Sequence, residues 1–202
     1  NYLSPFTRYQ QEKFLKLWLV VSNLNNLLPY LSRPISLIII FSIVYVFSLP
    51  PFGVSIFYYI SFSIIFYNIL INNNFSKKNI FYFFLFTQII TLSWITQSFY
   101  SGGFGYLFLG IILVGVLSLF IAFLHYSVTI LILVTFKKKL LQIFLLPLGL
   151  SIVEILKEFI FGGFPWNPSA IIYYKNIWIL KSLPFFGVYG LGLVVNLIVG
   201  LI

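Results

Sequence analysis

Charged residues are scarce in this chain. They make up 7% of its 202 residues, whereas 61% of the residues are hydrophobic. A soluble domain of this size has roughly a quarter of its residues charged, because water must solvate its surface. This chain has too few charged groups for that, so lipid must be the solvent for much of its side-chain area.

Cysteine and methionine are absent altogether. Without cysteine the chain has no disulfide, no thiolate nucleophile and no thiolate metal site. Without methionine, even at position 1, the sequence reads as a fragment or an incomplete gene. Only 3 acidic residues stand against 12 Lys and Arg, for a net charge of +9. The basic residues are spread between apolar runs rather than gathered on one face, so they predict membrane topology and not nucleic-acid binding.

Long apolar runs predict an all-α fold, a polytopic transmembrane helix bundle of about six spans. A barrel would show short alternating segments instead. The run 104–136 is too long for one straight span, so we expect a short membrane-surface piece followed by the fourth span. The predicted spans are residues 34–49, 54–71, 80–100, the later part of 104–136, 140–161 and 185–202, the last cut by the end of the chain.

The first 34 residues differ from the rest of the chain. Polar residues and Pro29 interrupt the apolar stretch 14–31, which makes it a poor span. We therefore expect a cytoplasmic or interfacial N-terminal segment over residues 1–34 and a transmembrane domain over residues 35–202.

Basic residues predict the orientation. Alternating spans place Arg33, the pair 77–78 and the triplet 137–139 on one side, which the positive-inside rule makes cytoplasmic. The 162–184 loop then faces outward, which is the periplasm if the chain lies in a bacterial inner membrane. Lys175 and Lys181 lie in that outer loop and count against the rule, but they are outnumbered.

Glu154, Lys157 and Glu158 stand out within the fifth predicted span. Their i, i+3 and i+4 spacing places them on one helix face, so Lys157 can pair with either carboxylate. Ionisable groups at membrane depth usually face a cavity or the bundle interior. The alternatives are an ion pair that fixes helix packing and a direct functional role.

A few further residues are unusual for a membrane span or for the turn after it. The loop after this span has glycines that permit unusual backbone angles, prolines that stiffen the path, and aromatic area for the interface. Asn196 in the last span is expected to make a helix–helix hydrogen bond. His125, the only histidine, is expected to be packed and neutral. We predict no metal site and no cofactor, because no ligand or phosphate-binding spacing is present.

The order of these motifs resembles the membrane part of the apolipoprotein N-acyltransferase family. The resemblance covers roughly residues 35–202. Its pieces are Glu154 to Lys157, then Gly163, Phe164, Pro165, Trp166 and Asn167, then the run 186–191, with Leu49 to Gly53 and Ser93 to Ile95 upstream.

The resemblance implies an activity and its partners. Members of that family take an acyl chain from a phospholipid and transfer it to the N-terminal diacylglyceryl cysteine of a lipoprotein. A Glu-Lys-Cys triad in a nitrilase-like domain performs the reaction through a thioester. In this chain the resemblance places Gly163 to Asn167 beside the substrate cavity, and Glu154, Lys157 and Asn196 as intramembrane polar support. Membrane lipids complete the expected partners.

The chain also departs from the family pattern. It lacks the cysteine, so no catalytic residue is present and these 202 residues alone are expected to be inactive. Lys157 stands where the family has an arginine and loses the bidentate fork. Two alternatives stay open, namely a small transporter or permease and a catalytically silent membrane-anchoring subunit. A family member that acylates a glycolipid is a further possibility.

Overall fold

A computed structural model describes residues 33–71, 75–100, 102–163 and 166–202. The chain divides into two compact units, residues 1–37 and 38–202, and the second holds nearly all of the described residues. The predicted interfacial segment 1–34 falls outside the described residues except for Arg33 and Pro34. That expectation stays a prediction.

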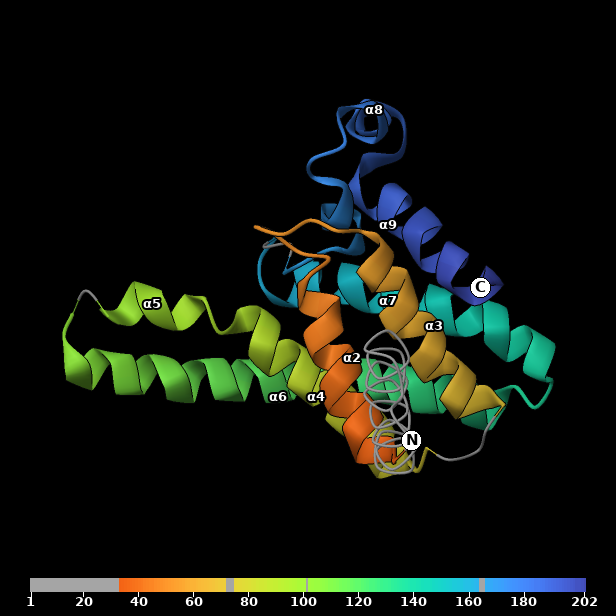
Figure 1. The fold of residues 1–202 in the computed structure, drawn as a ribbon, viewed down its shortest axis with the longest axis horizontal. Helices are drawn as coiled ribbons and strands as arrows, with labels where there is room; N and C mark the ends of the chain where they lie inside the picture. Colours follow the sequence, from red (N-terminus) through yellow and green to blue (C-terminus); the bar gives the residue numbers. More distant parts are fainter. Residues whose placement is uncertain (1–32, 72–74, 101, 164–165) are drawn as a thin grey trace, which may run out of the picture. The chain divides into compact units, whose positions relative to one another are not determined.

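The described residues form eight α-helices and a short 3₁₀ helix, without any strand. The predicted all-α class is confirmed for this part of the chain (Figure 1). The elements are α2 (Pro34–Val46), α3 (Ile56–Leu70), α4 (Lys77–Leu92), α5 (Ile95–Tyr100), α6 (Phe104–Thr135), α7 (Lys139–Ile160), η1 (Ser169–Tyr173), α8 (Ile177–Leu180) and α9 (Leu183–Leu201).

Three of these helices, α6, α7 and α9, are long and apolar enough to cross a membrane. α2 and α3 are apolar but only 13 and 15 residues long. At 1.5 Å per residue such helices span roughly 20–23 Å, short of the ~30 Å hydrocarbon core. The prediction of about six spans therefore holds in a coarser form, as an all-helical chain in which three helices qualify by length and composition.

α6 corrects the expectation for residues 104–136. The structure has no break between a surface piece and a span, because α6 runs without interruption for 32 residues (Figure 1). This corresponds to roughly 48 Å of helix. Its N-terminal half packs along α5. Gly110 permits this close approach, because a Cβ there would lie 2.9 Å from the Phe99 side chain.

The predicted span 80–100, by contrast, is divided into α4 and α5. Ser76 caps α4, since its side chain accepts a hydrogen bond from the Asn79 main-chain N–H. At the other end the Ser93 hydroxyl donates to the Ile90 carbonyl over 2.8 Å. Such back-bonding competes with the helical ladder and bends or ends helices. α4 accordingly stops at Leu92 and α5 begins at Ile95.

Aromatic side chains fill the core between the helices. Phe83 and Phe84 of α4 are almost fully buried, at 0% and 1% exposure. Phe62 of α3 packs edge-on against Phe83, with ring centroids 5.6 Å apart. The Ser42 hydroxyl of α2 lies 3.2 Å from that of Thr87, which adds a polar contact between α2 and α4. α4 also packs on α6, and α6 on α7.

α7 and α9 approach each other closely near the end of the described chain. A Cβ at Gly200 would lie 2.6 Å from the Ile143 carbonyl oxygen and 2.9 Å from Pro147. A main-chain atom cannot move aside as a flexible side chain can. Gly200 is therefore required for the observed distance between the two helices.

We predict that Gly200→Ala lowers thermal stability by forcing α9 away from α7. The matched control is Gly115→Ala in α6, where an added Cβ meets nothing within 4 Å. Because alanine is the better helix former by about 0.8–1 kcal/mol, the control should be neutral or stabilising. Melting temperatures of the purified variants in one detergent provide the measurement. Equal stability of both variants would contradict the tight contact.

Candidate functional site: a buried polar cluster under the loop after α7

α7 carries two ionisable side chains into the protein interior. Glu154 is 7% exposed and Lys157 is 3% exposed. They lie one helical turn apart, so both face the same side of α7. Burying such groups is costly unless they find polar partners. Their partners come from the segment that follows α7 and from α9.

The Glu154 carboxylate holds the start of η1. Its Oε1 accepts a hydrogen bond from the Ser169 main-chain N–H over 3.0 Å and another from the Ser169 hydroxyl. Two donors from one residue on one carboxylate oxygen fix both the position and the orientation of that residue. Ser169, Ala170 and Ile172 of η1 are buried as a result.

Asn196 of α9 extends the network to two further helices. It is fully buried, and its Nδ2 donates to the Ser151 hydroxyl of α7 over 2.8 Å. Its Oδ1 accepts from the Tyr58 hydroxyl of α3, and the Ser169 hydroxyl lies 3.1 Å from the same oxygen. Asn196 thus makes the helix–helix hydrogen bonds expected of it and joins α3, α7, α9 and η1.

Lys157 holds the loop itself. Its ammonium donates to the Trp166 carbonyl over 2.9 Å. The i, i+3 and i+4 spacing predicts pairing of Lys157 with Glu154 or Glu158, but the hydrogen bonds of Glu154 and Lys157 go to Ser169 and Trp166. The pair therefore stabilises the loop that follows the helix rather than α7 alone.

A small cavity lies between these groups. Its volume is about 30 Å³, which is enough to hold a water molecule. Glu154, Lys157 and His125 all line it. Its other lining side chains are Tyr45, Tyr58, Phe62, Phe84, Thr87, Gln88, Asn167 and Ser169.

His125 is packed, as expected from the sequence. Its ring stacks on Phe84 with centroids 5.0 Å apart, and its Nδ1 lies 2.9 Å from the Ile121 carbonyl. No acidic residue is near it along the chain. In space, however, it shares the cavity with Glu154 and Lys157.

Gly192 of α9 sets the space available to Glu154. A Cβ at this position would lie 3.0 Å from Glu154 Oε2. Oε2 itself is buried without a hydrogen-bond partner among the described residues. Because Gly192 has no side chain, the α9 backbone can lie this close to the Glu154 carboxylate.

The loop between α7 and η1 makes a tight turn at two glycines. Gly162 and Gly163 have φ values of 66° and 94°, which side chains with a Cβ rarely adopt. The Gly163 N–H donates to the Glu158 carbonyl over 2.8 Å and closes the turn. Phe164 and Pro165 lie outside the described residues.

Trp166 packs inward from this loop. Its ring lies 5.5 Å from that of Phe161, and both pack against a buried cluster of Leu92, Val114 and Ile121. Asn167 follows with a positive φ of 42°. The loop is thus attached by a carbonyl to Lys157 and by an indole to the apolar cluster.

The structure brings together Glu154, Lys157, Asn196, Trp166 and Asn167 of the sequence-predicted site residues. Sequence reasoning missed Tyr58, Ser151 and Ser169, which take part in five of the six hydrogen bonds described for the cluster. Single hydroxyls in apolar surroundings carry no spacing signal. Only the packing of α3 and η1 against α7 and α9 reveals them.

The two ionisable side chains of this cluster bond to groups of the protein itself. Glu154 Oε1 and the Lys157 ammonium already bond to the protein's own groups. Among the described residues, no three His, Asp or Glu side chains gather where they could hold a metal ion. The arrangement can fix the segment after α7, and its cavity can hold a small polar molecule.

Comparison with known proteins gives one match. The family model described as the apolipoprotein N-acyltransferase N-terminal domain matches residues 41–201. This range includes the whole buried polar cluster and all helices from α3 onward. No curated protein and no solved structure matches the chain.

We predict that Lys157→Met lowers the free energy of unfolding by about 3–5 kcal/mol, because it leaves the Glu154 charge buried without a cation nearby. The double variant Glu154→Gln, Lys157→Met should be more stable than Lys157→Met alone, since it removes the orphaned charge. Thermal or denaturant unfolding in detergent measures both.

The control for this cycle is Lys78→Met, which removes an exposed lysine at the start of α4. It should change stability by less than about 1 kcal/mol. If the double variant is as unstable as Lys157→Met, then the two charges are not coupled and the cluster does not depend on them.

Proposed function

The chain belongs to the apolipoprotein N-acyltransferase N-terminal domain family, and on that premise we propose that it is the membrane part of an enzyme that acylates lipoproteins. The enzyme would take an acyl chain from a membrane phospholipid and transfer it to the N-terminal diacylglyceryl cysteine of a lipoprotein. The match over residues 41–201 carries this proposal. It favours the acyltransferase over the small permease and over a glycolipid acceptor.

Catalysis itself is assigned to another part of the enzyme. A thioester route needs a cysteine nucleophile, and these 202 residues contain none. Glu154 and Lys157 do not replace the family's triad, because both are occupied in holding the loop after α7. The role of this chain is to anchor the catalytic domain in the bilayer and to shape the route by which both substrates reach it.

The loop after α7 is the proposed substrate-facing element. Gly163, Phe164, Pro165, Trp166 and Asn167 would lie beside the cavity through which the acyl donor and the lipoprotein enter. Support comes from the way the loop is held: Lys157 binds its Trp166 carbonyl, and Glu154 binds Ser169 just beyond it. A loop held at several points can present a fixed surface to substrates without an ordering cost at each turnover.

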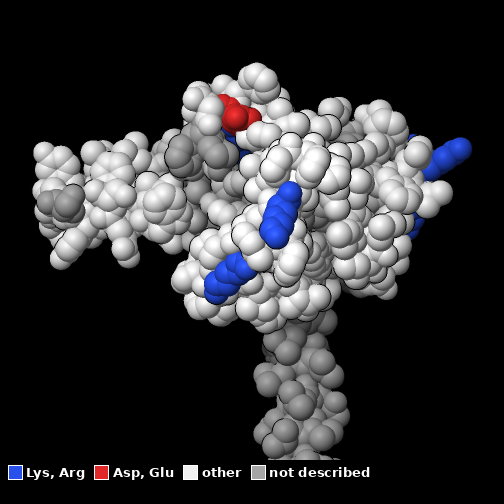
Figure 2. All heavy atoms as spheres, turned by 90° about the horizontal axis from the view of Figure 1, so that it is seen from above, with Lys and Arg blue, Asp and Glu red and all other residues white. Residues whose placement is uncertain are grey.

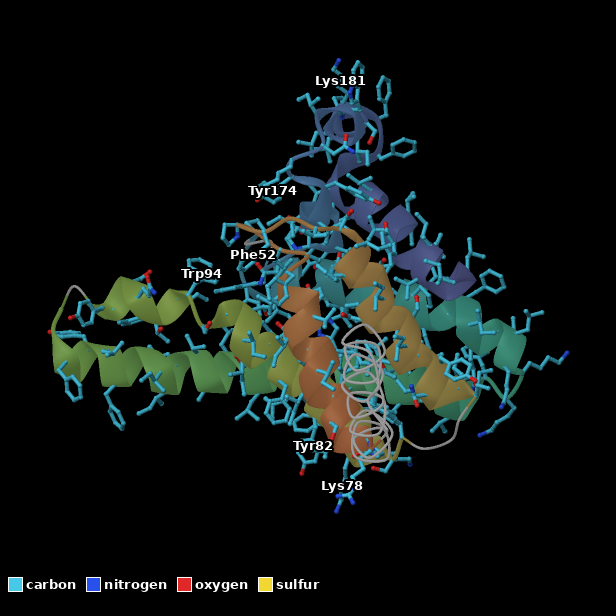
Figure 3. The ribbon with its side chains drawn as sticks, in the orientation of Figure 1. Phe52, Lys78, Tyr82, Trp94, Tyr174 and Lys181 are labelled. Atoms are coloured by element: carbon cyan, nitrogen blue, oxygen red, sulfur yellow. The ribbon has the colours of Figure 1, made fainter. Side chains whose placement is uncertain are left out.

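The proposal includes six spans and a defined orientation in a bacterial inner membrane. α2, α3 and α4 would cross the bilayer together with α6, α7 and α9. α4 would cross as a short span, and α5 follows it after the break at residues 93–94. In Figure 3 the labelled Lys78 and Lys181 lie at opposite edges of the view, at the bottom and the top. The positive-inside rule favours the Lys78 end, with the 137–139 triplet, as cytoplasmic and the α8 end as periplasmic.

The test is made in the complete enzyme that contains this domain. Trp166→Ala and Glu154→Ala should each lower lipoprotein acylation by about tenfold or more, because a loop displaced by an ångström misplaces the substrates. Acylation is measured by the mass of the lipoprotein N-terminus. Phe159→Ala, on the lipid-facing side of α7 with 80% exposure, is the control and should leave acylation unchanged. Unchanged acylation in both site variants would remove the site assignment.

A further inference from the structure

The segment from α8 to the first turn of α9 exposes large apolar side chains in a short stretch. Trp178 is 77% exposed and Phe185 is 85% exposed. Ile177 and Phe186 are also mostly exposed. Gly187, with a φ of 65°, separates this first turn from the rest of α9. These residues are therefore not the end of a packed span but a separate apolar projection.

A pocket lies beside this projection. Its volume is about 480 Å³, which falls within the ~300–1,000 Å³ typical of small-molecule sites. The side chains and main chain around it come from the turn before α3, from η1 and from α8. Its polar and aromatic lining includes Gly53, Ser55, Tyr173, Lys175, Asn176 and Trp178. We call this pocket the α8 pocket.

Lys175 reaches across the α8 pocket to the turn before α3. Its ammonium donates to the carbonyls of Pro51 and Phe52 over 3.0 and 2.8 Å. The Tyr174 hydroxyl donates to the same Pro51 carbonyl over 2.8 Å, and both Phe52 and Tyr174 are labelled close together in Figure 3. Both acceptors are neutral carbonyls, so they fix the ammonium in place without neutralising its charge.

The Lys181 ammonium also lies beside an uncharged group. Its ammonium lies over the Trp178 ring, 4.4 Å from the centroid. No Asp or Glu follows Glu158 in the sequence, so neither lysine gains a carboxylate from the segment around it. Figure 2 looks down on the molecule from the top of Figure 1, where α8 lies, and shows separate basic groups and one acidic group on an otherwise uncharged face.

We propose that the α8 pocket binds the phosphate headgroup of an anionic bilayer phospholipid, with Lys175 as the fixed cation. Trp178, Phe185 and Phe186 would lie in the headgroup–acyl boundary, where tryptophan and other amphipathic or apolar side chains are favoured. Lys181 would extend toward the phosphates over the Trp178 ring. The occupant is a lipid rather than a free phosphate, because apolar side chains border the pocket on the α8 side. This site does not depend on the proposed acyl transfer.

The first experiment measures lipid retention. The purified chain is incubated with phosphatidylglycerol or with phosphatidylcholine, and retained lipid is counted by native mass spectrometry. Phosphatidylglycerol should be retained preferentially, and Lys175→Gln should reduce its retention about tenfold, as expected for loss of one charge-assisted hydrogen bond. Lys175→Arg keeps the charge and should retain the lipid. Lys78→Gln, at the other end of the helices, is the control and should behave as the parent chain.

Three outcomes would overturn the proposal. Equal retention of both lipids would show that the site does not distinguish an anionic headgroup from a zwitterionic one. An equal effect of Lys175→Gln and Lys78→Gln would place the lipid elsewhere. Displacement of the lipid by inorganic phosphate at equal concentration would identify the pocket as a site for the free anion.

The second experiment measures membrane depth and does not rely on Lys175. Because the chain has no cysteine, Trp178→Cys and Phe185→Cys each give a single site for a spin label. In reconstituted bilayers both labels should collide more with oxygen, which dissolves in lipid, than with a water-soluble nickel chelate. Lys78→Cys is the control for an aqueous position. Preferential collision with the nickel chelate at residues 178 and 185 would exclude insertion of this segment.

Discussion

The bond between the Glu154 carboxylate and Ser169 determines how the second half of the chain is arranged. It ties α7 to η1, and through Asn196 it includes α3 and α9. In an apolar environment the alternative for each of these groups is to remain unsatisfied, which costs several kcal/mol. The network therefore specifies one register between the helices, where apolar packing alone would tolerate several.

Lys157 extends this constraint to the loop after α7. Because its ammonium binds the Trp166 carbonyl, the loop position is set from within the bundle. The indole then packs on Phe161 and reaches the cluster between α4 and α6. A loop that is held by a buried charge and a partly buried ring is suited to present a fixed surface. This attachment supports the proposed role of the loop beside the substrates.

Lipid solvation governs the rest of the structure. α6 leaves many large side chains exposed along its length, including Phe104 at 85% and Phe108 at 63%. Such a surface is unstable in water but not in a bilayer. Glycines let neighbouring helices approach closely, as at Gly110 and Gly200, which is typical of helix packing without a strong hydrophobic drive. Most of the described charged residues lie in the loops and turns at the ends of the helices.

The sequence by itself determined the helical class, because long apolar runs have no other solution in lipid. Its motif order also indicated the family, and the i, i+3 spacing of Glu154 and Lys157 placed both on one face of α7. Tertiary structure decided what those groups bind. Ser169 and Tyr58 reach Glu154 and Asn196 only because η1 and α3 pack there, and Trp166 offers its carbonyl only because the loop turns at Gly162 and Gly163. It also decided that α6 runs unbroken and that α4 and α5 separate, since neighbouring helices and local hydroxyl bonds override apolar length. Helix periodicity predicts which face of a helix is apolar. It does not predict which distant hydroxyl will bond to a polar group on that face.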